Sequence, residues 1–530
     1  MLQSLRGTRG MVTSSHHLAA ESGLRVLREG GNAVEAMVAA AATISVVYPH
    51  MNGLGGDGFW LISTPNERPP RAIGAVGAAA AQADEAFYRG RGCSLIPARG
   101  PLAANTAAGT IGGWQVALET SASWGGRLPL ARLLEDAVHY AEHGAPVTDG
   151  QYENVTAKHA ELKEVPGWSE TYLENGEPPL AGALFKQPAL AETFKRLAEA
   201  GLDDFYRGAL ARKIGADLER VGSPVTTEDL ARHRVMQTEA LSVRLGCGTV
   251  YNVMPPSQGM ASLIILGIFD RLGGREAEGF AHVHGLVEST KRAILLRNAH
   301  CTDPAYMDVD PRSLLSDQSL GELAGRIDAA RALPWSTGPV PGDTVWLGAV
   351  DDAGRAVSFI HSIYWEFGSG VVLRDTGIQC QNRGSSFSLD ANAQNYLHPG
   401  RLPFHTNNPA MALLNDGRVM AYGAMGGEGQ PQTQSAVFSR YALYGEGLQQ
   451  SITAPRWVLS RTWGDARTDL RLESRFSSEL VEMLGQAGHE VTIVDDFDQV
   501  MGHAGAVVLH PSGVIEGAAD PRSCGAVATF

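Results

Sequence analysis

The stretch PGDTVWLGAVDDAGRAVSFIHS, residues 341–362, predicts a β-hairpin that begins at a threonine. Residues 344–350 alternate and are rich in strand formers, DDAGR supplies turn residues, and residues 357–364 form a second apolar run. The preceding LPWSTGPVPG, residues 333–342, holds three prolines and two glycines, a composition that continues neither a helix nor a central strand. We therefore expect an exposed connector, followed at once by a strand whose first residue is Thr344.

Composition predicts an ordinary globular enzyme with a large core or two domains. The chain has 530 residues, of which 44% are hydrophobic and 19% are charged. Lys and Arg total 43 against 57 Asp and Glu, a net charge of −14, so no basic surface invites nucleic acid or an anionic membrane. An anionic substrate would need a cation placed locally in the site.

Cysteine usage and the N-terminal sequence predict residence in the cytoplasm. The five cysteines are odd in number, scattered and free of CxxC spacing, which argues against a disulfide framework and a zinc site and favours a reducing compartment: Cys93, Cys247, Cys301, Cys380 and Cys524. The first twenty residues lack the apolar core of a secretory signal. The longest nearly uncharged run, residues 36–47, is shorter than the roughly 20 residues of a membrane span.

The pattern is mainly helical before residue 344 and mainly strand-like after it. Two helices are expected between residues 17 and 47, meeting at GGN (30–32), and strands are expected at 243–253, 345–350, 357–363, 371–378, 410–414, 419–423 and 506–509. GLGGDG, residues 53–58, follows a helix and opens a strand, the reverse of a dinucleotide-binding loop. We interpret its glycines as sites of tight backbone packing.

A further helix is predicted at residues 281–296, and it carries His282, His284 and Glu288. These residues could in principle bind a metal. No further ligand is spaced nearby, so we expect them to occupy solvent or helix-face positions, and we predict no metal and no cofactor.

Several motifs, in order and nearly end to end, resemble the γ-glutamyltranspeptidase family of N-terminal-nucleophile hydrolases. They are SHHLAAESGLRVLREGGNAVEA (15–36), GLGGDG (53–58), MPPSQG (254–259), GDT (342–344), FGSG (367–370), GAMGGEG (423–429) and ADPRS (519–523). The resemblance implies a four-layer αββα fold of the α+β class, with antiparallel sheets flanked by helices. It also implies a proenzyme that cuts itself before Thr344 into a helix-rich large fragment, 1–343, and a small fragment, 344–530, both parts of one fold.

The resemblance assigns catalytic roles to four residues. Thr344 would be the nucleophile, and its α-amine, with an ordinary pKa of about 7.7 to 8.0, would be the base on the same residue. The adjacent amides of Gly426 and Gly427 would bind the oxyanion. Ser362 stands where the family has a second hydroxyl residue that hydrogen-bonds the nucleophile, on the strand that returns beside Thr344.

The departures from the family pattern concern the substrate. Tyr364, Arg383 and Ser386 stand where the family binds the γ-glutamyl amino group with an asparagine, a glutamine and an aspartate. Two serines of the family's carboxylate site are replaced by His405 and Thr406, and the stretch AIGAVGAAAA (72–81) lacks the family's carboxylate-binding arginine, although Arg71 precedes it. A pocket with no amino receptor and a new arginine suits a smaller acid whose carboxylate lies beside the scissile amide.

We therefore expect a self-processing amidohydrolase that converts oxamate to oxalate and ammonia through a Thr344 acyl-enzyme, an activity that the resemblance places in purine-ring breakdown. Its partners would be a small anionic amide and the two fragments of its own chain, with a homodimer of the processed pair. Three alternatives stay open. They are a γ-glutamyl hydrolase or transpeptidase, a cephalosporin-type acylase with a longer pocket, and a non-catalytic binding protein that keeps the fold and stays uncut.

Overall fold

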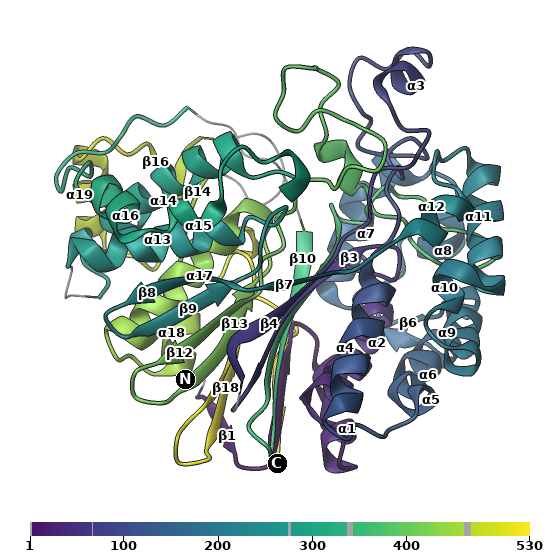
Figure 1. Cartoon of the computed structure of the whole chain (residues 1–530), viewed down its shortest axis with the longest axis horizontal. Coiled ribbons are helices and arrows are strands. Elements are labelled where there is room, and N and C mark those ends of the chain that lie inside the picture. Colours follow the sequence, from purple (N-terminus) through teal and green to yellow (C-terminus); the bar gives the residue numbers. More distant parts are fainter. Residues whose placement is uncertain (1–2, 66, 274–276, 337–342, 461–467) are drawn as a thin grey trace.

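Two seven-stranded sheets lie face to face between two layers of helices (Figure 1). The computed structural model describes residues 3–65, 67–273, 277–336, 343–460 and 468–530. Most of the connector predicted at 333–342 lies outside these ranges. The arrangement is the predicted four-layer αββα fold of the α+β class, with antiparallel sheets inside and helices outside.

Both large sheets are antiparallel throughout. The first has the order β1 (Leu5–Gly7), β18 (Ile515–Ala519), β17 (Ala504–Leu509), β13 (Val419–Ala424), β12 (Ala410–Leu414), β9 (Gly248–Asn252) and β8 (Leu241–Leu245). The second has the order β19 (Ala526–Thr529), β2 (Gly10–Ser14), β10 (Asp343–Asp351), β11 (Ala356–Tyr364), β3 (Asp57–Thr64), β4 (Glu67–Ala75) and β7 (Met236–Glu239). Each sheet therefore takes strands from both sides of residue 344.

Small sheets complete the strand inventory of the described residues. One contains β14 (Trp457–Leu459), β15 (Leu470–Glu473) and β16 (Val491–Val494), and the other pairs β5 (Ala145–Pro146) with β6 (Leu184–Phe185).

The helices on the outer face of the second sheet come from the first half of the chain. They and their neighbours are α1 (His17–Arg28), α2 (Ala33–Val47), α3 (Glu85–Arg89), α4 (Thr110–Ser123), α5 (Leu130–Leu133), α6 (Glu135–His143), α7 (Asp149–Leu162), α8 (Trp168–Tyr172), α9 (Pro188–Ala200), α10 (Asp204–Arg207), α11 (Ala209–Val221) and α12 (Thr227–Arg232). The predicted meeting of two helices at GGN is confirmed: Asn32 caps α2, and its side chain and that of Glu35 form a capping box.

The helices on the first sheet come from both halves. They are α13 (Gly259–Leu272), α14 (Phe280–His300), α15 (Pro311–Leu314), α16 (Asp317–Ala324), α17 (Gln430–Phe438), α18 (Leu448–Thr453) and α19 (Ser478–Gln486). Short turns of helix at Arg383–Ser386 (η2) and Gly427–Gly429 (η3) belong to the site described below.

Strand β3 shows how the layers are built. Phe59 and Leu61 belong to the core between the sheets, whereas Trp60 and Ile62 belong to the core beneath the helices. Successive side chains point to opposite faces of a strand, and both faces are covered here. The strand therefore reads as an unbroken apolar run rather than an alternating one.

The hairpin of β10 and β11 is the predicted one. Its strands pair in register from Val345 opposite His361 to Val350 opposite Ala356. Trp346 holds the hairpin against the first sheet: a Cβ on Gly423 or Gly505 would lie only 2.1 or 2.4 Å from the Trp346 ring. The two glycines thus let the indole lie flat across β13 and β17, which positions the start of β10 between the sheets.

Two predictions about local structure were wrong. Residues 371–378 form a loop with one isolated bridge, Val372 to Gln379, because the turn residues DTG interrupt the apolar run and Gly377 adopts a φ of 66°. The single strand expected at 243–253 is the hairpin of β8 and β9.

Helix 281–296 is confirmed as α14, but His282, His284 and Glu288 are buried rather than solvent-facing. All five cysteines are free thiols, in agreement with the sequence. Across the described residues, no helix combines the length and apolar character needed to cross a membrane.

The two ends of the chain meet. The backbone N–H groups of Thr8 and Arg9 donate hydrogen bonds to the carbonyl oxygen of Phe530, at 3.3 and 3.1 Å. The Arg9 guanidinium also lies 4.9 Å from the centre of the Phe530 ring. Both contacts lie at the edge where β2 pairs with β19.

Candidate active site

Thr344 lies at the beginning of β10, where the register of the hairpin shifts. Asp343 pairs with Tyr364, and Val345 pairs with His361. Ser362 and Ile363 therefore lie opposite Thr344. The Thr344 side chain is fully buried. The Ser362 hydroxyl oxygen accepts a hydrogen bond from the Tyr364 N–H at 2.8 Å. The structure thus brings the predicted nucleophile and the predicted second hydroxyl onto facing strands.

Two amide side chains contact the Thr344 hydroxyl. Thr344 Oγ1 donates to Asn407 Oδ1 at 3.1 Å, and Gln430 Nε2 donates to Thr344 Oγ1 at 3.1 Å. Asn407 lies in the loop before β12, and Gln430 is the first residue of α17. Sequence reasoning missed both residues, although Asn407 directly follows the predicted Thr406.

Gly426 and Gly427 form the turn that leads into α17. Their φ values of 118° and 51° are readily adopted only by glycine. No hydrogen bond from either amide N–H is found among the described residues, so both remain as donors for an oxyanion. The pair begins four residues before Gln430, whose side chain reaches Thr344. The glycine turn and the predicted nucleophile are thus linked through the first residue of α17.

A buried network behind the turn holds it in place. Gln258 Nε2 donates to the carbonyl oxygens of Gly427 and Thr406, at 2.8 and 2.7 Å. Gln258 Oε1 in turn accepts from Arg297 at 2.8 Å, and Arg297 forms a buried ion pair with Glu428 at 2.6 Å. One glutamine therefore ties the glycine turn to the loop that carries Thr406.

Arg383 is a fully buried cation in η2. Its Nη1 donates to Thr406 Oγ1 at 3.3 Å, and its guanidinium lies over the Tyr364 ring, 3.9 Å from the centre. Within the described part of the chain, its Nε and Nη2 have no hydrogen-bond partner. Burial lowers the pKa of Arg383 to about 10, against the opposing effects of Tyr364 and Asp57. The group therefore stays charged near neutral pH, with the N–H donors of two nitrogens free of any described partner.

Asp57 and His405 form a second buried pair beside Arg383. Asp57 Oδ2 lies 3.1 Å from His405 Nε2, and Asp57 Oδ1 accepts from the N–H groups of Gly77 and Gly109, at 2.9 and 3.0 Å. Burial raises the pKa of Asp57 to about 7, although these bonds and the charge of Arg383 oppose the shift. Burial, and then Arg383, hold the pKa of His405 well below its usual value, so the ring is neutral.

Asp57 belongs to the GLGGDG motif, where sequence reasoning considered only the glycines. The predicted tight backbone packing at these glycines is confirmed. A Cβ on Gly55 or Gly56 would lie 2.0 or 2.2 Å from a backbone oxygen of another segment. The aspartate was missed because a carboxylate at the start of a strand gives no signal of burial.

Tyr364 and Ser386 take different positions. Tyr364, the last residue of β11, is buried, has a φ of 83°, and stacks its ring against the Arg383 guanidinium. Ser386, at the end of η2, is partly exposed, and no hydrogen bond joins its hydroxyl to a described residue. Arg71 lies on β4, where its exposed side chain pairs with Glu67 at 2.7 Å, so it is not part of this cluster.

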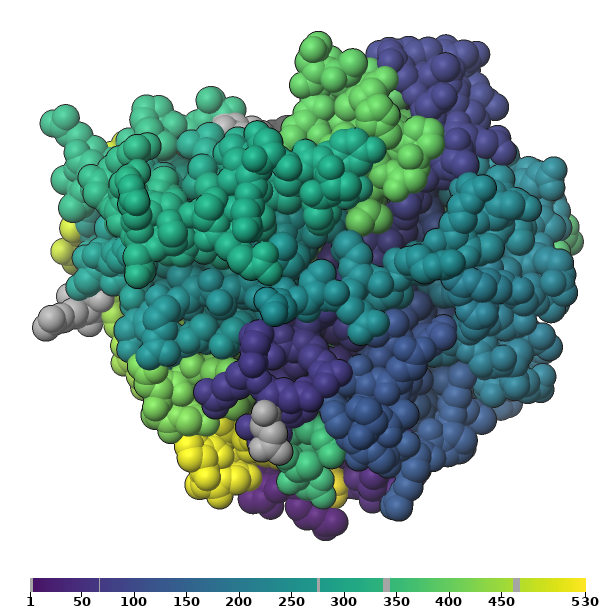
Figure 2. All heavy atoms as spheres, in the orientation of Figure 1, coloured from purple at the N-terminus to yellow at the C-terminus, as the bar shows by residue number. Residues whose placement is uncertain are grey.

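A lobe made of residues 84–103 and 387–400 projects at the top of the view in Figure 2. Its two parts are joined by the Tyr396 hydroxyl, which donates to Glu85 at 2.8 Å. Arg99 anchors the lobe to the segment after β11, because its Nη1 donates to the carbonyl oxygen of Glu366 at 2.7 Å and its guanidinium lies 5.2 Å from the Trp365 ring.

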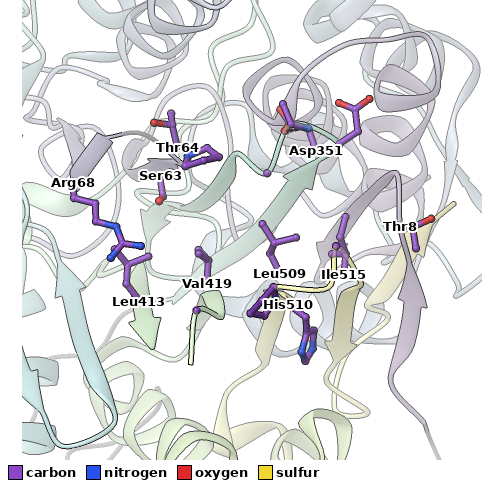
Figure 3. Close-up of a pocket in the computed structure, with 17 residues that line it drawn as sticks. Thr8, Ser63, Thr64, Arg68, Asp351, Leu413, Val419, Leu509, His510 and Ile515 are labelled. Atoms are coloured by element: carbon purple, nitrogen blue, oxygen red, sulfur yellow. Dashed lines mark hydrogen bonds between the residues drawn. The ribbon is translucent and has the colours of Figure 1, made fainter. Parts of the chain in front are cut away.

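A separate cavity of about 430 Å³ opens at the opposite end of β10. Arg68, Asp351 and His510 are among its lining residues (Figure 3). Its lining contains none of the residues that contact Thr344. The cavity is therefore not part of the candidate active site.

His284, Glu288 and His489 form a buried cluster whose potential ligand atoms lie within 4.8 Å of one another. The two histidines are hydrogen-bonded to each other at 2.9 Å. Glu288 is already paired with Lys291 and Arg292, at 2.8 and 3.3 Å. Two cations beside its only carboxylate disfavour a metal ion at this cluster.

Comparison with known proteins agrees with this geometry. The family model for gamma-glutamyltranspeptidase matches residues 19–530. The oxamate amidohydrolase proenzyme of Klebsiella pneumoniae subsp. pneumoniae is 55% identical over 524 residues, 99% of each chain. The glutathione hydrolase-like YwrD proenzyme of Bacillus subtilis is 40% identical over 528 residues, also 99% of each. The crystal structure of cephalosporin acylase from Bacillus halodurans superimposes with a TM-score of 0.90 and 32% identity, covering 100% of this chain and 97% of that one.

Proposed function

Because the chain belongs to the γ-glutamyltranspeptidase family, as an amidohydrolase made as a proenzyme, we propose that it hydrolyses oxamate to oxalate and ammonia. The observation that carries the proposal is the fully buried Arg383 guanidinium, which contacts Thr406 and whose Nε and Nη2 find no hydrogen-bond partner among the described residues. A buried cation with free donors is a receptor for a carboxylate. Oxamate places its carboxylate on the carbon next to the amide, so a short pocket suffices.

Maturation uses the same hydroxyl. Thr344 Oγ attacks the carbonyl carbon of residue 343, the peptide C–N bond breaks, and the nitrogen takes the proton that Oγ has lost. Water then hydrolyses the resulting ester, which leaves a carboxylate on residue 343 and a free α-amine on Thr344. We propose fragments 1–343 and 344–530 as the mature enzyme.

In turnover, Thr344 Oγ attacks the amide carbon of oxamate while its proton passes to the α-amine. The amides of Gly426 and Gly427 bind the oxyanion. The ammonium then gives its proton to the leaving nitrogen, the C–N bond breaks, and ammonia departs from an oxalyl ester. Water, deprotonated by the same amine, attacks the ester carbon. The bond to Oγ breaks, Oγ regains a proton, and oxalate leaves.

The substrate pocket distinguishes this proposal from its relatives. Tyr364 lies on Arg383 and shortens the space that a glutamyl or glutaryl chain would need. Position 386 carries a serine, which cannot neutralise an α-ammonium group. The similarity to a glutathione hydrolase-like protein and to a cephalosporin acylase makes γ-glutamyl and glutaryl amides the competing substrates.

The five free thiols support a reducing, cytoplasmic location.

The test is a comparison of three substrates on the processed enzyme. Ammonia release from oxamate is measured beside release of p-nitroaniline from γ-glutamyl-p-nitroanilide and of the β-lactam nucleus from glutaryl-7-aminocephalosporanic acid. We expect kcat/KM to be highest for oxamate by a wide margin. A γ-glutamyl or glutaryl substrate that matched or exceeded oxamate would overturn the proposal.

A further inference from the structure

The hydroxyl of Thr344 belongs to a chain of hydrogen bonds in which each group donates to the next, from Asn408 through Gln430 and Thr344 to Asn407. The Asn408 backbone N–H donates to Gln430 Oε1 at 3.2 Å, and the Asn408 side-chain amide donates to the same oxygen at 3.0 Å. Gln430 Nε2 donates to Thr344 Oγ1, which donates to Asn407 Oδ1, both at 3.1 Å. All four side chains are fully buried, so water does not compete for these bonds.

One backbone amide sets the direction of the whole chain. A backbone N–H can only donate, so the Gln430 oxygen has to face Asn408 and the Gln430 NH₂ group has to face Thr344. Oγ1 accepts from Gln430, and its own proton points to the oxygen of Asn407. The rotamer of the nucleophile and the direction of its proton are thus determined before any substrate binds.

We propose that Gln430 is a catalytic residue, and that it acts in both self-cleavage and amide hydrolysis. The proposal rests on the proposed function, in which Thr344 Oγ is the nucleophile. When Oγ1 loses its proton, the N–H of Gln430 already points at the oxygen on which negative charge develops. A hydrogen bond to a charged acceptor is about twice as strong as one between neutral groups, so the donor stabilises the transition state more than the resting hydroxyl.

Asn407 is the matching positioning residue. Its oxygen receives the hydroxyl proton in the resting state, and it is a neutral acceptor rather than a base. The proton therefore stays on Oγ1 until the nitrogen of Thr344 takes it, as the leaving peptide nitrogen in self-cleavage and as the free α-amine in turnover. This arrangement leaves one lone pair of Oγ1 occupied by Gln430 and the other free for the attack.

The chain offers a matched control on the same helix. Gln432 is equally buried, but its amide bonds the backbone of Glu428 and Leu459, and it has no contact with Thr344. Gln430→Met and Gln432→Met therefore remove the same group from two positions in the first turn of α17. A loss caused only by weakened packing should be similar in both.

The experiment measures self-cleavage over time by denaturing electrophoresis, and oxamate kinetics on processed protein. Co-expression of residues 1–343 with a fragment that begins at Thr344 after removal of the initiator methionine supplies processed enzyme when self-cleavage is slow. We expect Gln430→Met to slow self-cleavage and to lower kcat by about 10²-fold with little change in KM, as for loss of an oxyanion donor. Gln432→Met should stay within a few-fold of the wild type in both.

Gln430→Glu adds a second measurement, the pH dependence of kcat, which should not change if Gln430 has only a structural role. Its carboxylate cannot donate to Oγ1 when ionised but can when protonated, so its kcat relative to that of the wild type should rise as the pH falls. If Gln430→Met matched Gln432→Met in both rates, or if this ratio were independent of pH, the inference would be wrong. Wild-type protein that stays uncut or ignores oxamate would instead refute the proposed function itself.

Discussion

The carboxylate of Asp57 and the ring of His405 are 3.1 Å apart and fully buried, and both face the charge of Arg383. A carboxylate substrate bound to Arg383 therefore has to share that cation with an acid of the protein. Whether the protein's acid is ionised decides how strongly the substrate is held.

This relationship predicts that KM for oxamate depends on pH. Burial raises the pKa of Asp57 to about 7, so the group is neutral in more acidic solution and anionic above it. The substrate carboxylate stays ionised throughout this range. KM should therefore rise as the pH rises through about 7, because two anions then compete for Arg383. Asp57→Asn should show a low KM that varies little with pH, and a KM that rose equally in both proteins would contradict this explanation.

The same carboxyl group predicts a change in stability. Its folded pKa of about 7 exceeds the ordinary value of 3.8, so between these values the folded state binds the proton more tightly than the unfolded state. The stabilising contribution is complete below pH 3.8 and is lost as the pH rises through about 7. Urea unfolding of Thr344→Ala should show this loss, amounting to a few kcal/mol. The double variant with Asp57→Asn should show a smaller dependence over the same range.

Self-cleavage is predicted between Asp343 and Thr344, which both lie in β10. Denaturing electrophoresis should show two bands, and N-terminal sequencing of the smaller one should begin TVWLG. Thr344→Ala should stay whole because it has no hydroxyl to attack the peptide bond. A small fragment with any other first residue would show that the nucleophile lies elsewhere.

Arg383→Ala should lose oxamate turnover but keep self-cleavage. The guanidinium contacts Thr406 and Tyr364, not the Thr344 hydroxyl. Charge-assisted bonds contribute about 1.5 to 3 kcal/mol each, so kcat/KM should fall at least about tenfold. Arg383→Lys should recover little, since a point charge does not reproduce the planar fork. Unchanged oxamate kinetics in Arg383→Ala would exclude this residue from the pocket.

Arg297→Met should destabilise the protein, because it leaves the buried carboxylate of Glu428 without its cation. Breaking a buried pair by removing one partner costs about 3 to 5 kcal/mol. The lost support of Gln258 should also lower kcat through the glycine turn. Thermal unfolding measures the first effect, and the double variant with Glu428→Gln is its control. That variant should be more stable than Arg297→Met alone, and an equal or lower stability would argue against the ion pair as the cause.

Much of the fold was predictable because local patterns and tertiary structure agree. The hairpin of β10 and β11, the capped pair α1 and α2, and the four-layer arrangement all follow from periodicity, turn residues or family resemblance. The strand prediction for residues 371–378 was wrong because the apolar side chains of this segment pack into the core from a loop, without pairing to a neighbouring strand.

Sequence reasoning named site residues only at positions that align with sites of the family, whether the chain keeps the family's residue there or replaces it. Gln430 and Asn407 contact the Thr344 hydroxyl, yet an amide side chain has no spacing rule that would single it out. Asp57 lies far from His405 in sequence, and only the pairing of β11 with β3 brings it to the end of the hairpin. Such residues belong to the site because the fold brings them close together, and sequence periodicity does not predict contacts between residues distant in the chain.

The hydrogen bonds that Thr8 and Arg9 donate to Phe530 mean that one gene could encode the two predicted fragments in the opposite order. A circular permutant would start at Thr344, run to Phe530, cross a short linker and finish with residues 3–343, without disturbing either sheet. Removal of its initiator methionine would then expose the amine of Thr344 directly. Such an enzyme would be active without self-cleavage. The geometry needed for hydrolysis could then be studied apart from the geometry needed for self-cleavage.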